Sequence, residues 1–246
     1  MTIRGWKTRY HEIRNIFGYR KYDDLVSAKK LNSKIGRKYP ISEIKKTIKG
    51  QTVFIIGAGP SLSRSISTLK KYPNVTKIVA DGAVKALLEH NIKPQILVTD
   101  LDGDIASIKK IGKTKIPIII HAHGNNYDKL GIVAEFQNKI GTTQTKKFGK
   151  LENFGGFTDG DRCVFLAENF NAKKIILFGM DFGNKIGKYS KKKVIDRKTK
   201  LKKLECGKKL LEWLARKSDS ELYTTSRSIK GFKKISMVDL QCIVGN

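Results

Sequence analysis

Short, continuously apolar segments rich in β-branched residues recur along this chain from about residue 50 onward. Unbroken apolar runs of this kind are typical of strands that are covered on both faces, whereas strands with one face in water alternate with polar residues. Helical stretches separate the runs, which is typical of a parallel sheet wrapped by helices. The predicted strands are Val53–Ile56, Lys77–Ala80, Ile96–Thr99, Ile116–Ile120, Lys174–Phe178 and Glu221–Thr225.

The intervening segments complete an α/β prediction: a Rossmann-like, mostly parallel sheet with helices on both faces and right-handed crossovers. The predicted helices are Leu62–Lys71, Ala83–His90, Ile105–Ile111, Lys129–Lys139, Arg162–Asn169 and Lys200–Lys217. Residues 1–49 differ, because they are polar and aromatic, with helical stretches near Thr8–Phe17 and Asp23–Leu31. We therefore expect a small helical N-terminal subdomain over 1–49 and a Rossmann-like domain over 50–246.

Composition limits the class of protein. The chain has no apolar run of the roughly 18 residues that span a bilayer and no apolar stretch at its start, so we expect a cytoplasmic protein without a membrane partner. Its 3 cysteines are far apart and form no metal or disulfide pattern. A net charge of +28 implies an anionic ligand, although a solvated lysine-rich surface is an equal alternative.

Polar segments follow the predicted strands, where ligands bind in open α/β sheets. The first, Gly57-Ala58-Gly59-Pro60-Ser61, is a glycine-rich turn that would let backbone N–H groups approach a phosphate. Leu62 stands where a dinucleotide fingerprint has its third glycine, and no GK[ST] of a P-loop follows. A tight turn with Ser61 as helix cap is the alternative.

Acidic residues gather at the next two strand ends, in a protein otherwise poor in acid. Such a cluster repels itself unless a cation neutralises it, and magnesium prefers oxygen ligands shared with substrate phosphates. The predicted magnesium ligands are Asp81, Asp100, Asp102 and Asp104. The alternative, with Asp104 as a helix N-cap and Asp102 as a turn residue, explains only part of the set.

Further candidates lie later in the chain. His121 and His123 share one face if their strand continues, and they could bind phosphate, position a water or accept a proton, while a structural role for one stays open. In the loop 153–162, Phe154 or Phe157 could stack on a flat heterocycle whose edge bonds Asp159 or Asp161, and a capped turn with Asp161 as N-cap is the alternative. The basic segment 183–203 predicts a mobile loop that runs into a helix.

The ordered motifs GAGPSL, ADGA, TDLDGD, HAHGNN, GGFTDGDR and GMDFGNKIGKYS resemble the archaeal MptE-like family of 6-hydroxymethyl-7,8-dihydropterin diphosphokinases over about residues 51–204. ADGA and TDLDGD are also similar to the aspartate-rich motifs of thiamin diphosphokinases. The resemblance implies transfer of diphosphate from ATP to the hydroxymethyl group of a reduced pterin, with Mg²⁺ and release of AMP.

Site roles follow from the same resemblance. It implies phosphate binding by Gly57, Gly59, Pro60 and Ser61, closure over the triphosphate by Lys185, Lys188 and Ser190, and magnesium ligation by Asp81, Asp100, Asp102 and Asp104. The catalytic candidates are Asp100, Asp102, His121 and His123, and the substrate-binding candidates are Asn126, Phe157, Thr158, Asp159, Asp161 and Asp181.

Other classes remain as alternatives. A diphosphokinase acting on thiamin or another small alcohol would share these motifs, and the +28 charge with the run Lys191–Lys193 favours a nucleic-acid-binding protein. The missing glycine counts against a nicotinamide-dependent Rossmann enzyme. We expect ATP and a reduced pterin alcohol as partners and no specific nucleic acid, while homo-oligomer formation stays open.

Overall fold

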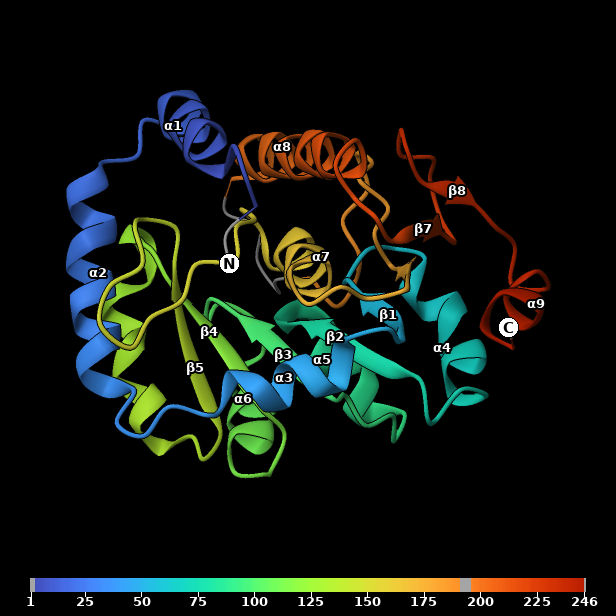
Figure 1. Ribbon diagram of the computed structural model, residues 1–246, viewed down its shortest axis with the longest axis horizontal. Helices are drawn as coiled ribbons and strands as arrows, with labels where there is room; N and C mark the ends of the chain where they lie inside the picture. Colours follow the sequence, from blue (N-terminus) through green and yellow to red (C-terminus); the bar gives the residue numbers. More distant parts are fainter. Residues whose placement is uncertain (1–2, 191–195, 246) are drawn as a thin grey trace.

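One parallel sheet forms the centre of the molecule (Figure 1). The computed structural model describes residues 3–190 and 196–245, and within these ranges the strand order is β5-β4-β3-β2-β1-β6-β7-β8, with parallel pairing throughout. The strands are β1 (Thr52–Ile56), β2 (Thr76–Ala80), β3 (Ile96–Thr99), β4 (Ile118–Ala122), β5 (Lys139–Thr143), β6 (Lys174–Phe178), β7 (Glu221–Thr224) and β8 (Lys233–Lys234). The predicted fold class is thereby confirmed.

Helices surround the sheet on both faces. They are α1 (Trp6–Phe17), α2 (Lys21–Lys34), α3 (Ile41–Ile48), α4 (Leu62–Lys70), α5 (Asp81–Glu89), α6 (Ile105–Gly112), α7 (Asp159–Asn169), α8 (Arg197–Ala215) and α9 (Leu240–Val244), with a 3₁₀ segment η1 (Gly124–Glu135). No helix in the described ranges is long and apolar enough to cross a membrane. Residues 191–195, which include the predicted Lys191–Lys193 run, lie outside the described residues.

Alternate side chains of each strand enter two different cores. Val53 and Ile55 of β1 face the core that α1, α3, α7 and α8 complete, whereas Phe54 and Ile56 face the core that includes α4, α5 and α6. All of these strand residues are fully buried. Burial on both faces explains why the strands are continuously apolar in sequence.

The strand order reverses beside β1, because the chain adds β2 to β5 on one side of it and then places β6 on the other. The turns after β1 and β6 consequently lie together, with Gly57 N–H donating to Phe178 O at 2.8 Å and Gly59 N–H donating to Gly179 O at 2.7 Å. Ligands of open α/β sheets bind in the crevice at such a reversal. The fold therefore places a crevice at the carboxyl ends of the central strands.

The N-terminal helices pack directly on this architecture. Trp6 of α1 contacts Phe165 of α7 edge to face, with ring centroids 5.7 Å apart, and Leu31 of α2 is fully buried in the core that faces β4 and β5. Figure 1 shows α2 beside β5. Residues 1–49 therefore share both hydrophobic cores of the sheet, and the domain boundary at residue 50 stays a prediction.

The structure corrects the prediction of a helix over Lys129–Lys139. Residues 124–135 form a 3₁₀ segment, and Lys139 begins strand β5. The Lys139 side chain is buried, with its Nζ donating to Val133 O and Ala134 O at 3.0 Å each. A charged residue is not expected in a buried strand, so the sequence pattern did not predict β5. Strand β8 and helices α3 and α9 were likewise not predicted, and β4 is shifted to end at Ala122.

Candidate active site

A cavity of about 610 Å³ opens at the carboxyl ends of the strands. The turns after β1, β2, β3, β4 and β6 supply one wall, and we call this the sheet-edge wall. The opposite wall, here called the helical wall, comes from the α1–α2 connection, the start of α7 and the start of α8. The sheet-edge wall includes Gly57, Gly59, Pro60, Asp81, Asp100, Asp102, His123, Asp181, Lys185 and Ser190. The helical wall includes Tyr19, Phe157, Thr158, Asp159, Arg162, Thr199, Lys200 and Lys203.

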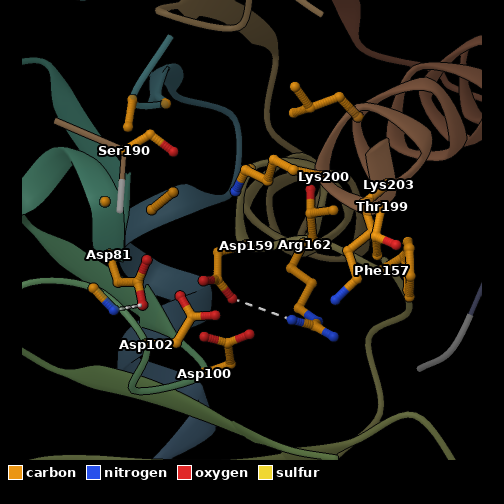
Figure 2. A pocket seen from close by; sticks show the side chains of 18 of the residues that line it. Asp81, Asp100, Asp102, Phe157, Asp159, Arg162, Ser190, Thr199, Lys200 and Lys203 are labelled. Atoms are coloured by element: carbon orange, nitrogen blue, oxygen red, sulfur yellow. Dashed lines mark hydrogen bonds and ion pairs between the residues drawn. The ribbon is translucent and has the colours of Figure 1, made fainter. Parts of the chain in front are cut away.

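Asp81, Asp100 and Asp102 form an acidic cluster within this cavity, with ligand-capable oxygens all within 4.8 Å of one another (Figure 2). Asp81 opens α5 directly after β2, and the other two follow β3. Leu101 between them is buried and has a φ of 67°, a left-handed conformation that is uncommon for a residue with a large side chain. This turn lets Asp100 and Asp102 both reach the cluster while Leu101 enters the core.

Asp81 is fixed before any ligand binds. Its Oδ2 accepts hydrogen bonds from Thr99 Oγ1 at 3.1 Å and from Gly103 N–H at 3.0 Å. Burial, followed by the charges of Asp100 and Asp102, raises the pKa of Asp81 to about 7. The cluster is therefore preorganised and electrostatically crowded, as expected of a cation site.

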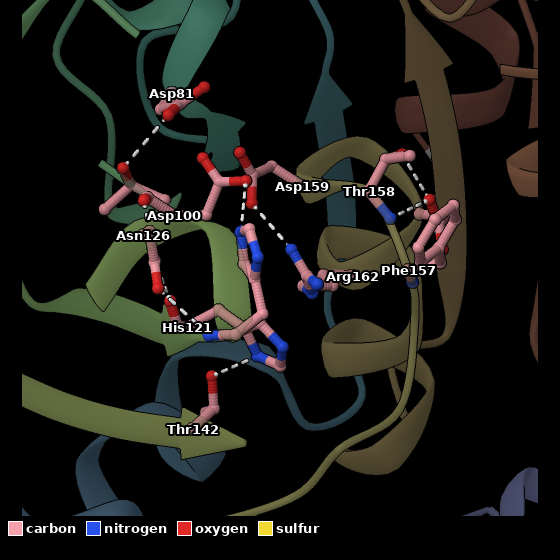
Figure 3. Close-up of polar contacts among 12 residues, drawn as sticks. Asp81, Asp100, His121, Asn126, Thr142, Phe157, Thr158, Asp159 and Arg162 are labelled. Carbon is pink, nitrogen blue, oxygen red and sulfur yellow. Dashed lines mark hydrogen bonds and ion pairs between the residues drawn. The ribbon is translucent and has the colours of Figure 1, made fainter. Parts of the chain in front are cut away.

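Asp159 and Arg162 extend the cluster from α7. Arg162 Nη1 lies 3.1 Å from Asp159 Oδ1, and the two side chains are only 6% and 10% exposed (Figure 3). Burial, and then the charges of Asp100 and Asp81, raises the pKa of Asp159. The sequence prediction named Asp159 as a binding residue and did not name Arg162. Residues three apart on a helix are neighbours, so their spacing could have predicted this ion pair.

His123 contacts the acidic cluster directly. Its Nε2 lies 3.1 Å from Asp100 Oδ2, and its Nδ1 accepts the N–H of Asn125 at 3.2 Å. Because Nδ1 is an acceptor, Nε2 carries the hydrogen and donates it to Asp100. In this tautomer His123 orients the Asp100 carboxylate, and the catalytic role predicted for His123 stays a prediction.

Asn126 and His121 lie behind this contact. Asn126 is buried, donates to Asp100 O at 2.8 Å and His121 O at 2.7 Å, and accepts from His123 N–H at 3.0 Å, so it ties the ends of β3 and β4 together. The His121 ring contacts Thr142 Oγ1 at 3.0 Å, and burial lowers the pKa of His121 (Figure 3). In the described parts of the chain, neither side chain lines the large cavity.

Asp104 points elsewhere. It is the N-cap of α6, where its Oδ2 accepts from Ser107 N–H at 3.1 Å and from Ser107 Oγ at 2.7 Å, and its Oδ1 lies 3.7 Å from Lys85 Nζ. The group of clustered acids in the described ranges does not include it. The N-cap alternative accounts for Asp104, and its ligand role remains only a prediction.

The glycine-rich turn packs against the turn after β6. A Cβ on Gly59 would lie 2.2 Å from Asp181 Oδ2 and 2.6 Å from Gly179 O, so glycine is required there by close packing. Asp181 accepts from Ser61 N–H at 3.0 Å and from Ser61 Oγ at 2.9 Å. The polar groups of Ser61 therefore hold the two turns together, and Gly57, Gly59, Pro60 and Asp181 line the cavity.

Asp161 has a structural role in the first turn of α7. It is fully buried and accepts hydrogen bonds from Phe157 N–H at 2.6 Å, from Thr158 N–H at 2.8 Å and from Thr158 Oγ1. Thr158 is the N-cap and Asp161 completes the capping box, so the predicted alternative of Asp161 as N-cap was wrong in detail. Asp161 fixes the backbone of Phe157, which lines the cavity.

Basic side chains line both ends of the cavity. Lys185 and Ser190 lie in its wall, whereas Lys188 Nζ lies 4.8 Å from the ring centre of Tyr189, and closure of the three over a triphosphate stays a prediction. Lys200 and Lys203 of α8 were not predicted as site residues. In Figure 2, Ser190 lies on the same side of the view as Asp81, whereas Phe157, Thr199 and Lys203 lie on the other side, beyond Asp159 and Arg162.

The sequence of this chain matches a known protein family and several archaeal proteins. The family model described as 6-hydroxymethylpterin diphosphokinase MptE-like matches residues 28–187. Proteins named 6-hydroxymethyl-7,8-dihydropterin pyrophosphokinase are similar along nearly their whole length. The Methanocaldococcus jannaschii protein is 42% identical over 238 residues, covering 90% of this chain and 99% of its own. The Pyrococcus furiosus protein is 43% identical over 217 residues, covering 85% and 92%.

These matches show that the chain belongs to the MptE-like family, and the resemblance inferred from the motifs is confirmed. A third relative of the same name, from Methanothermobacter thermautotrophicus, is 37% identical over 226 residues, covering 89% of this chain and 97% of its own. A solved structure, the MAf glycosyltransferase of Magnetospirillum magneticum AMB-1, has a TM-score of 0.61 at 14% identity, covering 88% of this chain and 38% of that one. It shares the fold alone.

Proposed function

We propose that this protein transfers diphosphate from ATP to the hydroxymethyl oxygen of 6-hydroxymethyl-7,8-dihydropterin and releases AMP. The observation that carries the proposal is a cavity whose lining combines the glycine-rich turn after β1, here called the glycine-turn end, with clustered carboxylates and with the aromatic and lysine side chains of the helical wall. The names of the archaeal relatives support the same activity.

The acidic cluster fits Mg²⁺. Asp81, Asp100 and Asp102 offer hard oxygen donors within 4.8 Å of one another. Burial, and then the charges of Asp100 and Asp102, raises the pKa of Asp81, and a bound cation would offset both effects. When bound there, magnesium would neutralise charge on the phosphates during transfer.

The glycine-turn end suits the triphosphate. Gly59 and Pro60 line it, as do Lys185 and Ser190, and Gly187 between the last two packs against Ala58. Because Asp181 already accepts the Ser61 amide and hydroxyl, we assign phosphate contacts to Lys185 and Ser190, and we assign Ser61 the task of holding the turn.

The reaction requires in-line positioning more than a strong base. The hydroxymethyl oxygen forms a bond to the β-phosphorus, the bond between that phosphorus and the oxygen bridging to the α-phosphorus breaks, and AMP keeps the bridging oxygen. The hydroxyl proton is released. His123 holds Asp100 in orientation, and Arg162 with Lys200 places positive charge beside the transferred group.

The test is a turnover assay with ATP, Mg²⁺ and alternative alcohols, in which AMP is measured. We expect AMP with the reduced 6-hydroxymethylpterin and a far higher kcat/KM for it than for thiamin. A higher kcat/KM for thiamin would overturn the acceptor assignment, and absence of AMP with every alcohol would overturn the diphosphokinase proposal itself.

A further inference from the structure

The connection between α1 and α2 lies in the wall of the active-site cavity, although it is far in sequence from every motif of the site. Gly18, Tyr19 and Arg20 line the cavity together with Phe157 and Lys203. This places an N-terminal segment opposite the sheet-edge wall. No sequence motif pointed to it.

Tyr19 is held firmly in this position. Its N–H donates to Arg14 O at 3.0 Å, and Arg14 Nε donates back to Tyr19 O at 3.2 Å. Helix α2 is tied to the active-site loop by Asp24, which accepts from Tyr10 Oη at 2.6 Å and from Gly124 N–H at 2.9 Å. The connection is therefore anchored on both sides, as expected of a preorganised binding wall.

Tyr19 and Phe157 form an aromatic corner. Their ring centres are 6.5 Å apart at an interplanar angle of 44°, and Phe17 packs behind both, at 5.5 Å from Tyr19 and 5.1 Å from Phe157. Lys203 Nζ lies 5.7 Å from the Tyr19 ring centre and 5.9 Å from that of Phe157. Such a corner offers a flat heterocycle a stacking surface beside a hydrogen-bond donor.

The geometry of transfer decides which substrate reaches this corner. The attacking oxygen and the leaving AMP lie on opposite sides of the β-phosphorus, roughly in line. Lys185 and Ser190, assigned to the triphosphate, line the cavity together with the glycine-rich turn, and in Figure 2 Phe157 and Lys203 lie on the opposite side of the view from Ser190, beyond Asp159 and Arg162. The donor nucleotide therefore occupies one end, and the acceptor enters from the end that bears Tyr19.

We propose that Tyr19 is a specificity-determining residue that contacts the ring of the acceptor alcohol, so the N-terminal helices complete the acceptor subsite. This inference rests on the proposed diphosphokinase function. It assigns the α1–α2 connection a direct part in choosing the acceptor.

The test compares steady-state kinetics of Tyr19→Ala and Tyr19→Phe with wild type. Tyr19→Ala should raise KM for the reduced pterin alcohol roughly ten- to hundredfold, the range expected when one stacked aromatic is lost, and leave KM for ATP within about twofold. Tyr19→Phe keeps the ring and should restore KM. Tyr22→Ala is the matched control, because Tyr22 is 71% exposed at the start of α2 and does not line the cavity among the described residues.

Thermal unfolding of each variant separates contact from misfolding. An unchanged acceptor KM in folded Tyr19→Ala, with wild type active, would overturn the Tyr19 inference and leave the proposed function standing. If Tyr19→Ala raised KM for ATP alone, the aromatic corner would belong to the nucleotide site, and the Tyr19 inference would also be overturned. A wild type that forms no AMP would overturn the proposed function and this inference with it.

Discussion

The two walls of the cavity are built in different ways. The sheet-edge wall consists of short turns directly after strands, and its acidic residues are fixed by neighbours a few positions away or on the adjacent strand, as Asp81 is by Thr99 and Gly103. The helical wall gathers Tyr19, Phe157 and Lys203 from distant parts of the chain. Under the proposed function, the carboxylates of the sheet edge would serve the transfer, while Tyr19 and Phe157 of the helical wall would select the acceptor.

Loss of a carboxylate on the sheet-edge wall should have the largest effect. Asp100→Asn and Asp102→Asn should each lower kcat about 10²–10³-fold, since charge stabilisation in the transition state is lost, and circular dichroism should show an intact fold. Asp104→Ala tests the fourth predicted ligand, and we expect mainly the loss of about 1 kcal/mol of stability that follows from removing an N-cap. Near-normal activity in both cluster variants, with unchanged magnesium dependence, would contradict the metal assignment.

His123→Gln should have the next largest effect, because His123 lines the cavity and its Nε2 contacts Asp100, whose carboxylate it orients. We expect kcat to fall about 10–100-fold, the usual cost of losing a residue that orients a metal ligand, with a higher magnesium requirement. His11→Gln is the control, since His11 is exposed on α1. A loss of activity with unchanged magnesium dependence would show that His123 acts otherwise.

On the helical wall, Phe157→Leu should act on selectivity instead of turnover. It keeps apolar bulk against Phe17 but removes the stacking face, so we expect roughly a five- to tenfold smaller preference for the pterin over thiamin. The measurement is the ratio of the two kcat/KM values. An equal loss for both alcohols would show that Phe157 supports the site without discriminating between them.

The high positive charge should have the smallest effect on catalysis. Exposed lysines act on polyanions through counterion release, so any binding to DNA or RNA should be independent of sequence and fall steeply with salt. Added nucleic acid should change kcat by less than about twofold at 0.15 M salt, where the Debye length is about 8 Å. Tight, sequence-selective binding at that salt would favour the nucleic-acid alternative.

Much of the fold and of the sheet-edge wall was predictable because its signals are local. The apolar runs placed β1, β2, β3 and β6 within one residue at either end, and the polar motifs after them fixed which side chains meet at the carboxyl edge. The identity of the acidic cluster followed, but the sequence did not separate Asp81, Asp100 and Asp102 from Asp104. That separation depends on Leu101 in a left-handed turn and on the start of α6.

The sequence by itself therefore determined a parallel sheet covered on both faces and a set of carboxylates at its edge. Both could be predicted because a buried strand and its polar end are each a run of neighbouring residues. Only the tertiary structure decided that Lys139 enters a strand, that Asp161 holds Phe157 while Asp159 meets Arg162, and that Tyr19 reaches the cavity. These outcomes depend on packing between segments far apart in the chain. A local sequence pattern does not predict which distant residue will pack against a given side chain.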